Sequence, residues 1–179
     1  VVVTSVIIGI FLLFLSLGYY KGGLVTQNFK KILGRNFLIA GCICAFGFST
    51  AFLNSLVFLL HSCHLKGPMI FLIIFLSLIL APIIFCLGQT IPITFNLFPQ
   101  ARGGLITSQV LFFSTVGSFL GAIFTAAILF DLIGVSLTIW LVSSCILLLA
   151  VLIDRQSKDS LFKALIVLTT IVITNHLLR

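Results

Sequence analysis

The chain has 179 residues, of which 61% are hydrophobic and only 7% are charged, and its formal net charge is +7. A soluble domain carries about 25% charged residues, and folding at this size still leaves about a third of the chain's surface in water. A chain this apolar lacks the polar surface for that, so soluble, disordered and fibrous classes are excluded. The composition, with a mean hydropathy of +1.37, is that of an integral membrane protein.

Acidic residues are nearly absent, which narrows the function. Only Asp131, Asp154 and Asp159 are present, and there is no glutamate. Acid–base catalysis and cation coordination depend on carboxylates. The basic residues are scattered and do not form the stripe that is typical of nucleic-acid binding. There is also no phosphate-binding glycine loop, dinucleotide fingerprint or nucleophile elbow. We therefore assign this chain no catalytic residue, no cofactor and no nucleic-acid partner.

About six segments are apolar enough to cross a membrane, because a spanning helix needs about 20 mostly apolar residues. The apolar runs are continuous, whereas the strands of a membrane barrel would alternate. The sequence therefore predicts an all-α membrane protein, a polytopic bundle whose partner is the lipid bilayer. The predicted helices cover residues 1–20, 37–60, 69–87, 105–130, 133–153 and 161–178.

The connections between these helices are predicted from polar residues, proline and glycine. Residues 21–36 are predicted to form a loop, Asp131 a tight turn, and Pro82 a kink near the end of the third helix. Residues 88–104 either extend that helix or form a re-entrant piece that lines a cavity. The chain begins at Val1 with an apolar run, so we expect a fragment that is cut at the start of a spanning helix.

Orientation follows from the basic residues in short loops, which favour the cytoplasmic side. Eight of the ten lysines and arginines fall on one side of the predicted bundle, and Lys66 and Arg179 fall on the other. We therefore predict that residues 21–36, 88–104 and 154–160 face the cytoplasm. The eight are Lys21, Lys30, Lys31, Arg35, Arg102, Arg155, Lys158 and Lys163.

Small side chains recur every fourth residue in two of the predicted helices. In helix 105–130 the pattern includes Gly117 and Gly121, and in helix 37–60 it begins at Gly41. Small residues let helix backbones approach closely in lipid, where packing drives association. We expect Gly117 and Gly121 to set a close helix crossing within the chain, with a homodimer contact or a moving transporter interface as alternatives.

Amides inside the apolar segments are the candidate polar groups. Asn54, Gln89 and Gln109 either line a neutral polar cavity or join helices by hydrogen bonds. None is ionisable, so the usual sign of a proton or ion path is missing from these helices. The stretch from His61 to His64 offers three soft ligands, but a zinc site needs a fourth, and we assign no metal site.

Three glycine motifs occur in order along the chain. They are a double glycine after the first helix, a G-x-T-x-P segment after the third, and an S-T-x-G-x-x-x-G pattern inside the fourth. In this order and spacing they resemble the membrane region of bacterial fused spermidine-synthase-like proteins, over most of residues 1–153. The motif positions are Gly22, Gly23, Gly88, Thr90, Pro92, Gly117 and Gly121.

This resemblance implies a fold and a cellular context. The family joins a major-facilitator-like helical bundle, in the bacterial inner membrane, to an aminopropyltransferase-like domain that holds an S-adenosylmethionine-like cofactor. The chain then corresponds to about half of such a bundle, without the first helix and without the soluble domain. It departs from the pattern at Gln27 and Asn28, where the family has Asp-Arg, at Ile93 and at Ser114.

Three functions are consistent with these patterns. The leading hypothesis is the membrane domain of a spermidine-synthase-like fusion protein, which anchors the protein and handles a small molecule. The first alternative is one half of a secondary transporter of the major facilitator type, because such carriers consist of parallel halves. The second is a structural anchor, in which polar substitutions at Asn54 or Gln109 change stability alone.

The predicted orientation can be tested in intact cells. A Lys30→Cys variant is expected to stay unlabelled by a membrane-impermeant thiol reagent, above the background of the five native cysteines, because its loop faces the cytoplasm. Labelling should appear once the membrane is permeabilised. Labelling in intact cells contradicts the orientation.

Overall fold

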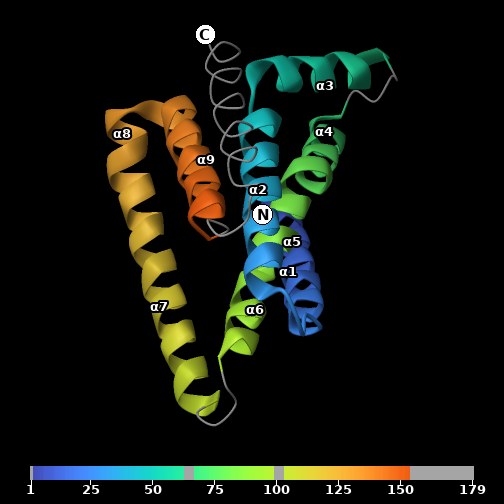
Figure 1. The fold of residues 1–179 in the computed structure, drawn as a ribbon. Helices are drawn as coiled ribbons and strands as arrows, with labels where there is room; N and C mark the ends of the chain where they lie inside the picture. Colours follow the sequence, from blue (N-terminus) through green and yellow to red (C-terminus); the bar gives the residue numbers. More distant parts are fainter. Residues whose placement is uncertain (1, 63–66, 99–102, 154–179) are drawn as a thin grey trace.

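The computed structural model describes residues 2–62, 67–98 and 103–153, and every regular element in these ranges is helical (Figure 1). The elements are α1 (Val2–Gly23), α2 (Phe29–Gly47), α3 (Thr50–Ser62), α4 (Pro68–Phe75), the π-helical turn η1 (Leu76–Leu80), α5 (Ala81–Gly88), α6 (Thr90–Leu97), α7 (Gly103–Phe124), the π-helical turn η3 (Thr125–Leu129), α8 (Phe130–Leu132) and α9 (Gly134–Ile153).

The all-helical fold predicted from the sequence is confirmed in the described ranges, and several of its helices have the length and composition of membrane spans. Four helices are long and apolar enough to cross a membrane: Val3–Gly23, Met69–Leu97, Gly104–Leu132 and Gly134–Ile153. The bent pair of α2 and α3 makes a fifth if it counts as one span. The predicted helix over residues 161–178 lies outside the described residues.

The turn that was predicted at Asp131 forms three residues later. Asp131 still belongs to α8, and the chain reverses at Gly134, whose φ is +77°. A left-handed backbone of this kind is easily adopted by glycine, which has no Cβ. The polar residue Asp131 indicated the region of the turn. Its position is set by Gly134, the residue that adopts the left-handed backbone.

The predicted loop over residues 21–36 is wrong in most of its length. α1 continues to Gly23 and α2 already begins at Phe29, so the connection has only five residues. Asn28 adopts the left-handed conformation before α2, with φ 54°, which asparagine tolerates better than most residues. The basic side chains of Lys30, Lys31 and Arg35 limit how much of the helix lies in hydrocarbon. They do not end the helix, because lysine and arginine are good helix formers.

The prediction of one helix over residues 37–60 is also wrong. α2 ends at Gly47, and the axes of Phe29–Gly47 and Phe52–Ser62 diverge by 68°. Phe48 leaves the helical conformation with φ −95° and ψ 7°. As a result α3 runs across one end of the bundle instead of continuing α2 (Figure 1).

Of the two alternatives for residues 88–104, the extension of the third helix is the one observed as far as Leu97. The continuous span Met69–Leu97 comprises α4, η1, α5 and α6. Pro82 has no N–H, and the π-helical turn η1 directly precedes α5. There the Ala81 N–H donates to the Leu76 carbonyl, five residues back. The helix thus accommodates its proline by a π-turn, a common device at such positions.

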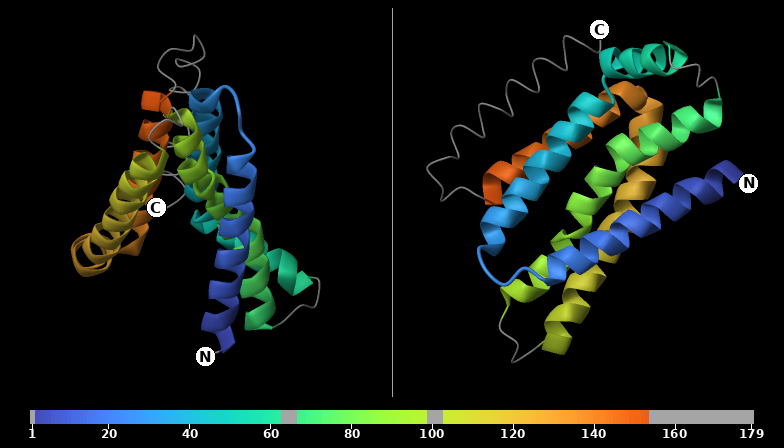
Figure 2. Two further views of the ribbon diagram at one scale, coloured as in Figure 1. Left: turned by 90° about the horizontal axis from the view of Figure 1, so that it is seen from below. Right: turned by 90° about the vertical axis from the view of Figure 1, so that its right-hand side faces the viewer.

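α2 packs between α9 and the third span, and α1 packs against the α5 and α6 parts of that span (Figure 2). The core of the bundle is the cluster Ala40, Ile79, Ile83 and Cys86, between α2 and the third span. The small residues predicted to bring α2 close to a neighbour do so, because a Cβ at Gly41 would lie 2.7 Å from the Leu147 side chain of α9.

The span from α7 to α8 stands apart from this core. It meets α6 at one end and α9 at the other, and none of the most apolar stretch of Gly104–Leu132 is buried (Figure 1). A Cβ built at Gly117 or Gly121 finds no atom of the described residues within 4 Å. The close crossing expected at these two glycines is therefore absent from the described ranges.

Candidate functional site

α1 and α5 cross with their backbones in contact, and two glycines make this possible. A Cβ at Gly18 would lie 2.7 Å from the Phe85 carbonyl oxygen and 3.2 Å from the Gly88 Cα. A Cβ at Gly88 would lie 3.2 Å from the Leu15 carbonyl oxygen. Real Cβ atoms do not approach backbone atoms as closely as the first of these distances, so only glycine fits at position 18.

One turn further along α1, Gly22 continues this contact and Gly23 does not. A Cβ at Gly22 would lie 2.7 Å from the Pro92 ring and 2.8 Å from the Gln89 carbonyl oxygen. Gly23 has open space around it. Two of the three motif stretches, around Gly22 and around Gly88, thus form one junction, to which Gly18 also belongs.

A buried hydrogen bond joins a third helix to this junction. The Asn36 side-chain amide donates to the Gln89 side-chain oxygen at 2.9 Å, and the two residues are only 4% and 8% exposed. An amide inside the hydrocarbon region needs a partner, because lipid offers none. Gln89 therefore joins helices, which was one of the two roles predicted for it. Asn36 was missed because it stands beside the charged start of α2.

The end of α6 holds the loop that follows α1. The Asn96 side-chain amide donates to the carbonyl oxygens of Gly23 at 3.2 Å and Val25 at 3.0 Å. These bonds place the end of α6 at the same end of the bundle as Lys21 and the start of α2. Asn96 was also missed, although an amide in an otherwise apolar stretch was the available signal.

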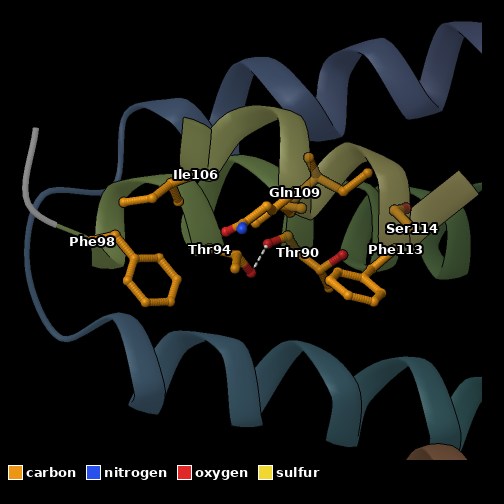
Figure 3. Close-up of a pocket in the computed structure, with 9 residues that line it drawn as sticks. Thr90, Thr94, Phe98, Ile106, Gln109, Phe113 and Ser114 are labelled. Atoms are coloured by element: carbon orange, nitrogen blue, oxygen red, sulfur yellow. Dashed lines mark hydrogen bonds between the residues drawn. The ribbon is translucent and has the colours of Figure 1, made fainter. Parts of the chain in front are cut away.

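A cleft of about 560 Å³ separates α6 from α7 on the other side of α6 (Figure 3). Its walls are mainly apolar, and a phenyl ring lies toward each end, from Phe98 and Phe113. The polar groups come from Thr90, Thr94, Gln109 and Ser114. The complete lining is Thr90, Ile91, Thr94, Phe98, Ile106, Gln109, Val110, Phe113 and Ser114.

The polar groups of the cleft are uncharged and differ in what they offer a ligand. The Thr90 hydroxyl donates to the Leu87 carbonyl, and the Thr94 hydroxyl donates to the Thr90 carbonyl, both at 2.7 Å. Their donors are therefore occupied, and their oxygens remain acceptors. The Gln109 amide lies toward the cleft in Figure 3 and provides both a donor and an acceptor. The lining can bind a ligand, but it contains no carboxylate, imidazole or thiol.

The three amides predicted as a polar cavity do not come together. Gln109 lines the cleft, Gln89 is bonded to Asn36, and Asn54 is exposed on α3 at the opposite end of the bundle. The cavity of Asn54, Gln89 and Gln109 is thus a wrong grouping, because the bend after Gly47 carries Asn54 away. Of the motif residues, Thr90 lines the cleft, and Pro92 packs against Gly22 instead.

Metal binding has no support in the described ranges, which contain no group of three His, Cys, Asp or Glu side chains suited to a metal ion. His61 is exposed at the end of α3. Cys63 and His64 lie outside the described residues.

No family model, curated protein or solved structure matches this chain.

The glycine junction makes a prediction about stability. Gly18→Ala is expected to destabilise the protein by about 1–3 kcal/mol, because the new methyl group overlaps the Phe85 carbonyl oxygen and α1 has to move. The midpoint of thermal unfolding, measured in detergent, should fall accordingly.

Gly117→Ala is the matched control, since this glycine is also in a membrane helix but has open space around it. We expect it to leave the midpoint unchanged or raise it slightly, because alanine has the higher helix propensity. An equal decrease for both variants rules out the backbone contact at Gly18.

Proposed function

We propose that this chain is the membrane domain of a spermidine-synthase-like protein of the bacterial inner membrane, and that it holds a small linear amine in the cleft between α6 and α7. The cleft carries the proposal, since it is a cavity of the described residues in which polar groups from two helices converge. Sites for small molecules commonly have such apolar walls and a few polar groups.

The position of the cleft supports this function. α6 ends beside the loop between α1 and α2, to which Asn96 is bonded, and this end of the bundle carries Lys21, Lys30 and Lys31. Basic residues favour the cytoplasmic side. The cleft therefore lies near the predicted cytoplasmic face, where an appended aminopropyltransferase-like domain would take up or release its amines.

The chemistry of the cleft predicts weak binding. An amine would meet the faces of Phe98 and Phe113 and the oxygens of Thr90, Thr94 and Gln109, without a carboxylate to pair with. A cation–π contact contributes about 0.5–2 kcal/mol. We therefore expect dissociation constants of about a millimolar, or about −4 kcal/mol, as suits a site that passes a molecule on.

The test measures the binding of putrescine and spermidine to the protein in lipid nanodiscs by isothermal titration calorimetry. Phe113→Ala should weaken binding about threefold or more, because it removes a cation–π contact. Phe119→Ala is the matched control, since Phe119 is exposed on the same helix but does not line the cleft.

Two outcomes would contradict the proposal. One is an equal effect of the two substitutions, which removes the cleft from the binding site. The other is equal binding of 1,4-butanediol, the uncharged analogue of putrescine, which turns the cleft into a site for neutral molecules.

A second candidate function is one half of a secondary transporter. The observation that favours it is the isolation of α7, none of whose most apolar stretch is buried and whose Gly117 and Gly121 have open space around them. In carriers of this type a second bundle packs against such a surface and encloses the substrate between the halves. Uptake of labelled putrescine into proteoliposomes that contain this chain together with a second bundle would support a transporter.

A further inference from the structure

We propose that α3 is an interfacial helix, which lies along the outer surface of the membrane at the boundary between lipid headgroups and acyl chains. It is then neither the second half of a broken span nor a re-entrant segment. The bilayer surface is its partner, and the argument depends on the position, the two faces and the length of the helices around it.

The position of α3 relates it to the ends of the spanning helices. α3 turns away from α2 by 68° and lies at the end of the bundle where α4 begins and where the chain turns between α8 and α9 (Figures 1 and 2). Those are the outer ends of two 29-residue spans. Lys30, Lys31 and Arg35 lie at the opposite end, at the start of α2.

α3 has two different faces. One carries Phe52, Leu53, Leu56 and Leu60, which are half-buried or buried, and Phe52 packs on the Phe46 ring at a centroid distance of 5.4 Å. The other face carries the exposed polar residues Asn54, Ser55, His61 and Ser62. This division follows the helical period, and the apolar face is directed toward the bundle.

The flanks of α3 are apolar as well, as a helix embedded in lipid requires. Val57 and Leu59, on either side of the buried face, are 52% and 58% exposed, and Phe58, on the side of the polar residues, is 75% exposed. In water these side chains would be costly to expose, whereas in the interfacial layer Val57 and Leu59 reach the acyl chains.

The length of α2 sets the depth of α3. After Arg35, the apolar part of α2 covers residues 36–47 and rises about 18 Å, which is less than the roughly 30 Å of the hydrocarbon core. α3 adds only about 7 Å along the axis of α2, because its 13 residues run at 68° to it. Because α2 is short, α3 lies in the outer boundary layer of the membrane and not in the water outside it.

Tryptophan quenching by brominated lipids measures this depth directly. In a Trp140→Phe background, which removes the only native tryptophan, Phe58→Trp and Leu59→Trp each place one tryptophan on α3. Phe119→Trp is the control for the bilayer centre, because it lies near the middle of the span Gly104–Leu132 and is 63% exposed. Each protein is reconstituted into phosphatidylcholine brominated either near the headgroup or near the chain ends.

We expect both α3 variants to be quenched most by bromine near the headgroup, and Phe119→Trp most by bromine near the chain ends. Quenching of both α3 variants that matches the Phe119→Trp control places α3 in the hydrocarbon core and overturns the proposal in favour of a broken span or re-entrant segment. Absence of quenching by either lipid places α3 in water and overturns it too. The two α3 variants serve as replicates, so that loss of one through misfolding leaves the other to decide.

Discussion

The contact of two helix backbones at Gly18 and Gly88 is the constraint on which the rest of the described bundle depends. Without side chains at these positions, α1 approaches α5 until a Cβ at Gly18 would overlap the Phe85 carbonyl oxygen. In lipid, helix association is driven by such close packing, since acyl chains are as apolar as the side chains they replace. The crossing also places Gly22 one turn on, against Gln89 and Pro92.

This crossing leads to the polar contacts of the junction. With α1 on one side of Gln89, the Gln89 side chain extends to the other side and accepts the hydrogen bond of Asn36 from α2. Three helices therefore meet at the boundary between α5 and α6. The opposite face of α6 is left for the cleft, where Thr90, directly after Gln89, contributes to the lining. One short segment thus both holds the bundle together and forms the candidate site.

The sequence was sufficient to predict an all-helical protein with apolar spans, but it predicted the ends of the helices less well. Hydropathy identified the spans that begin near Val2, Met69, Gly104 and Gly134, because water-to-lipid transfer depends on composition. It placed the start of α2 too late, since Lys30 and Lys31 are excluded from hydrocarbon but not from a helix. It also missed the bend after Gly47, where only the small polar residues Ser49 and Thr50 interrupt the apolar run.

Prediction of the site was limited because the sequence does not show which helices are neighbours. A glycine in an apolar run is consistent with close packing, but the sequence does not say which helix lies opposite, so Gly41 and Gly117 were given similar expectations and have opposite surroundings. Likewise, Asn54, Gln89 and Gln109 were grouped by residue type, and only the bend and the packing of α6 separate them. Three-dimensional neighbours, rather than residue types, decided both cases.

Cross-linking between the end of α1 and the end of α6 tests the central crossing most directly. Gly23→Cys and Asn96→Cys are combined in one chain and treated in native membranes with a short bifunctional maleimide, because the Asn96 amide nitrogen lies 3.2 Å from the Gly23 carbonyl oxygen while a side chain at position 23 has open space around it. We predict an intramolecular cross-link in this double variant, but not in either single variant or in Gly23→Cys combined with Phe119→Cys. No cross-link, or cross-linking of equal extent in the Phe119 pair, would contradict the close approach of α1 to the third span.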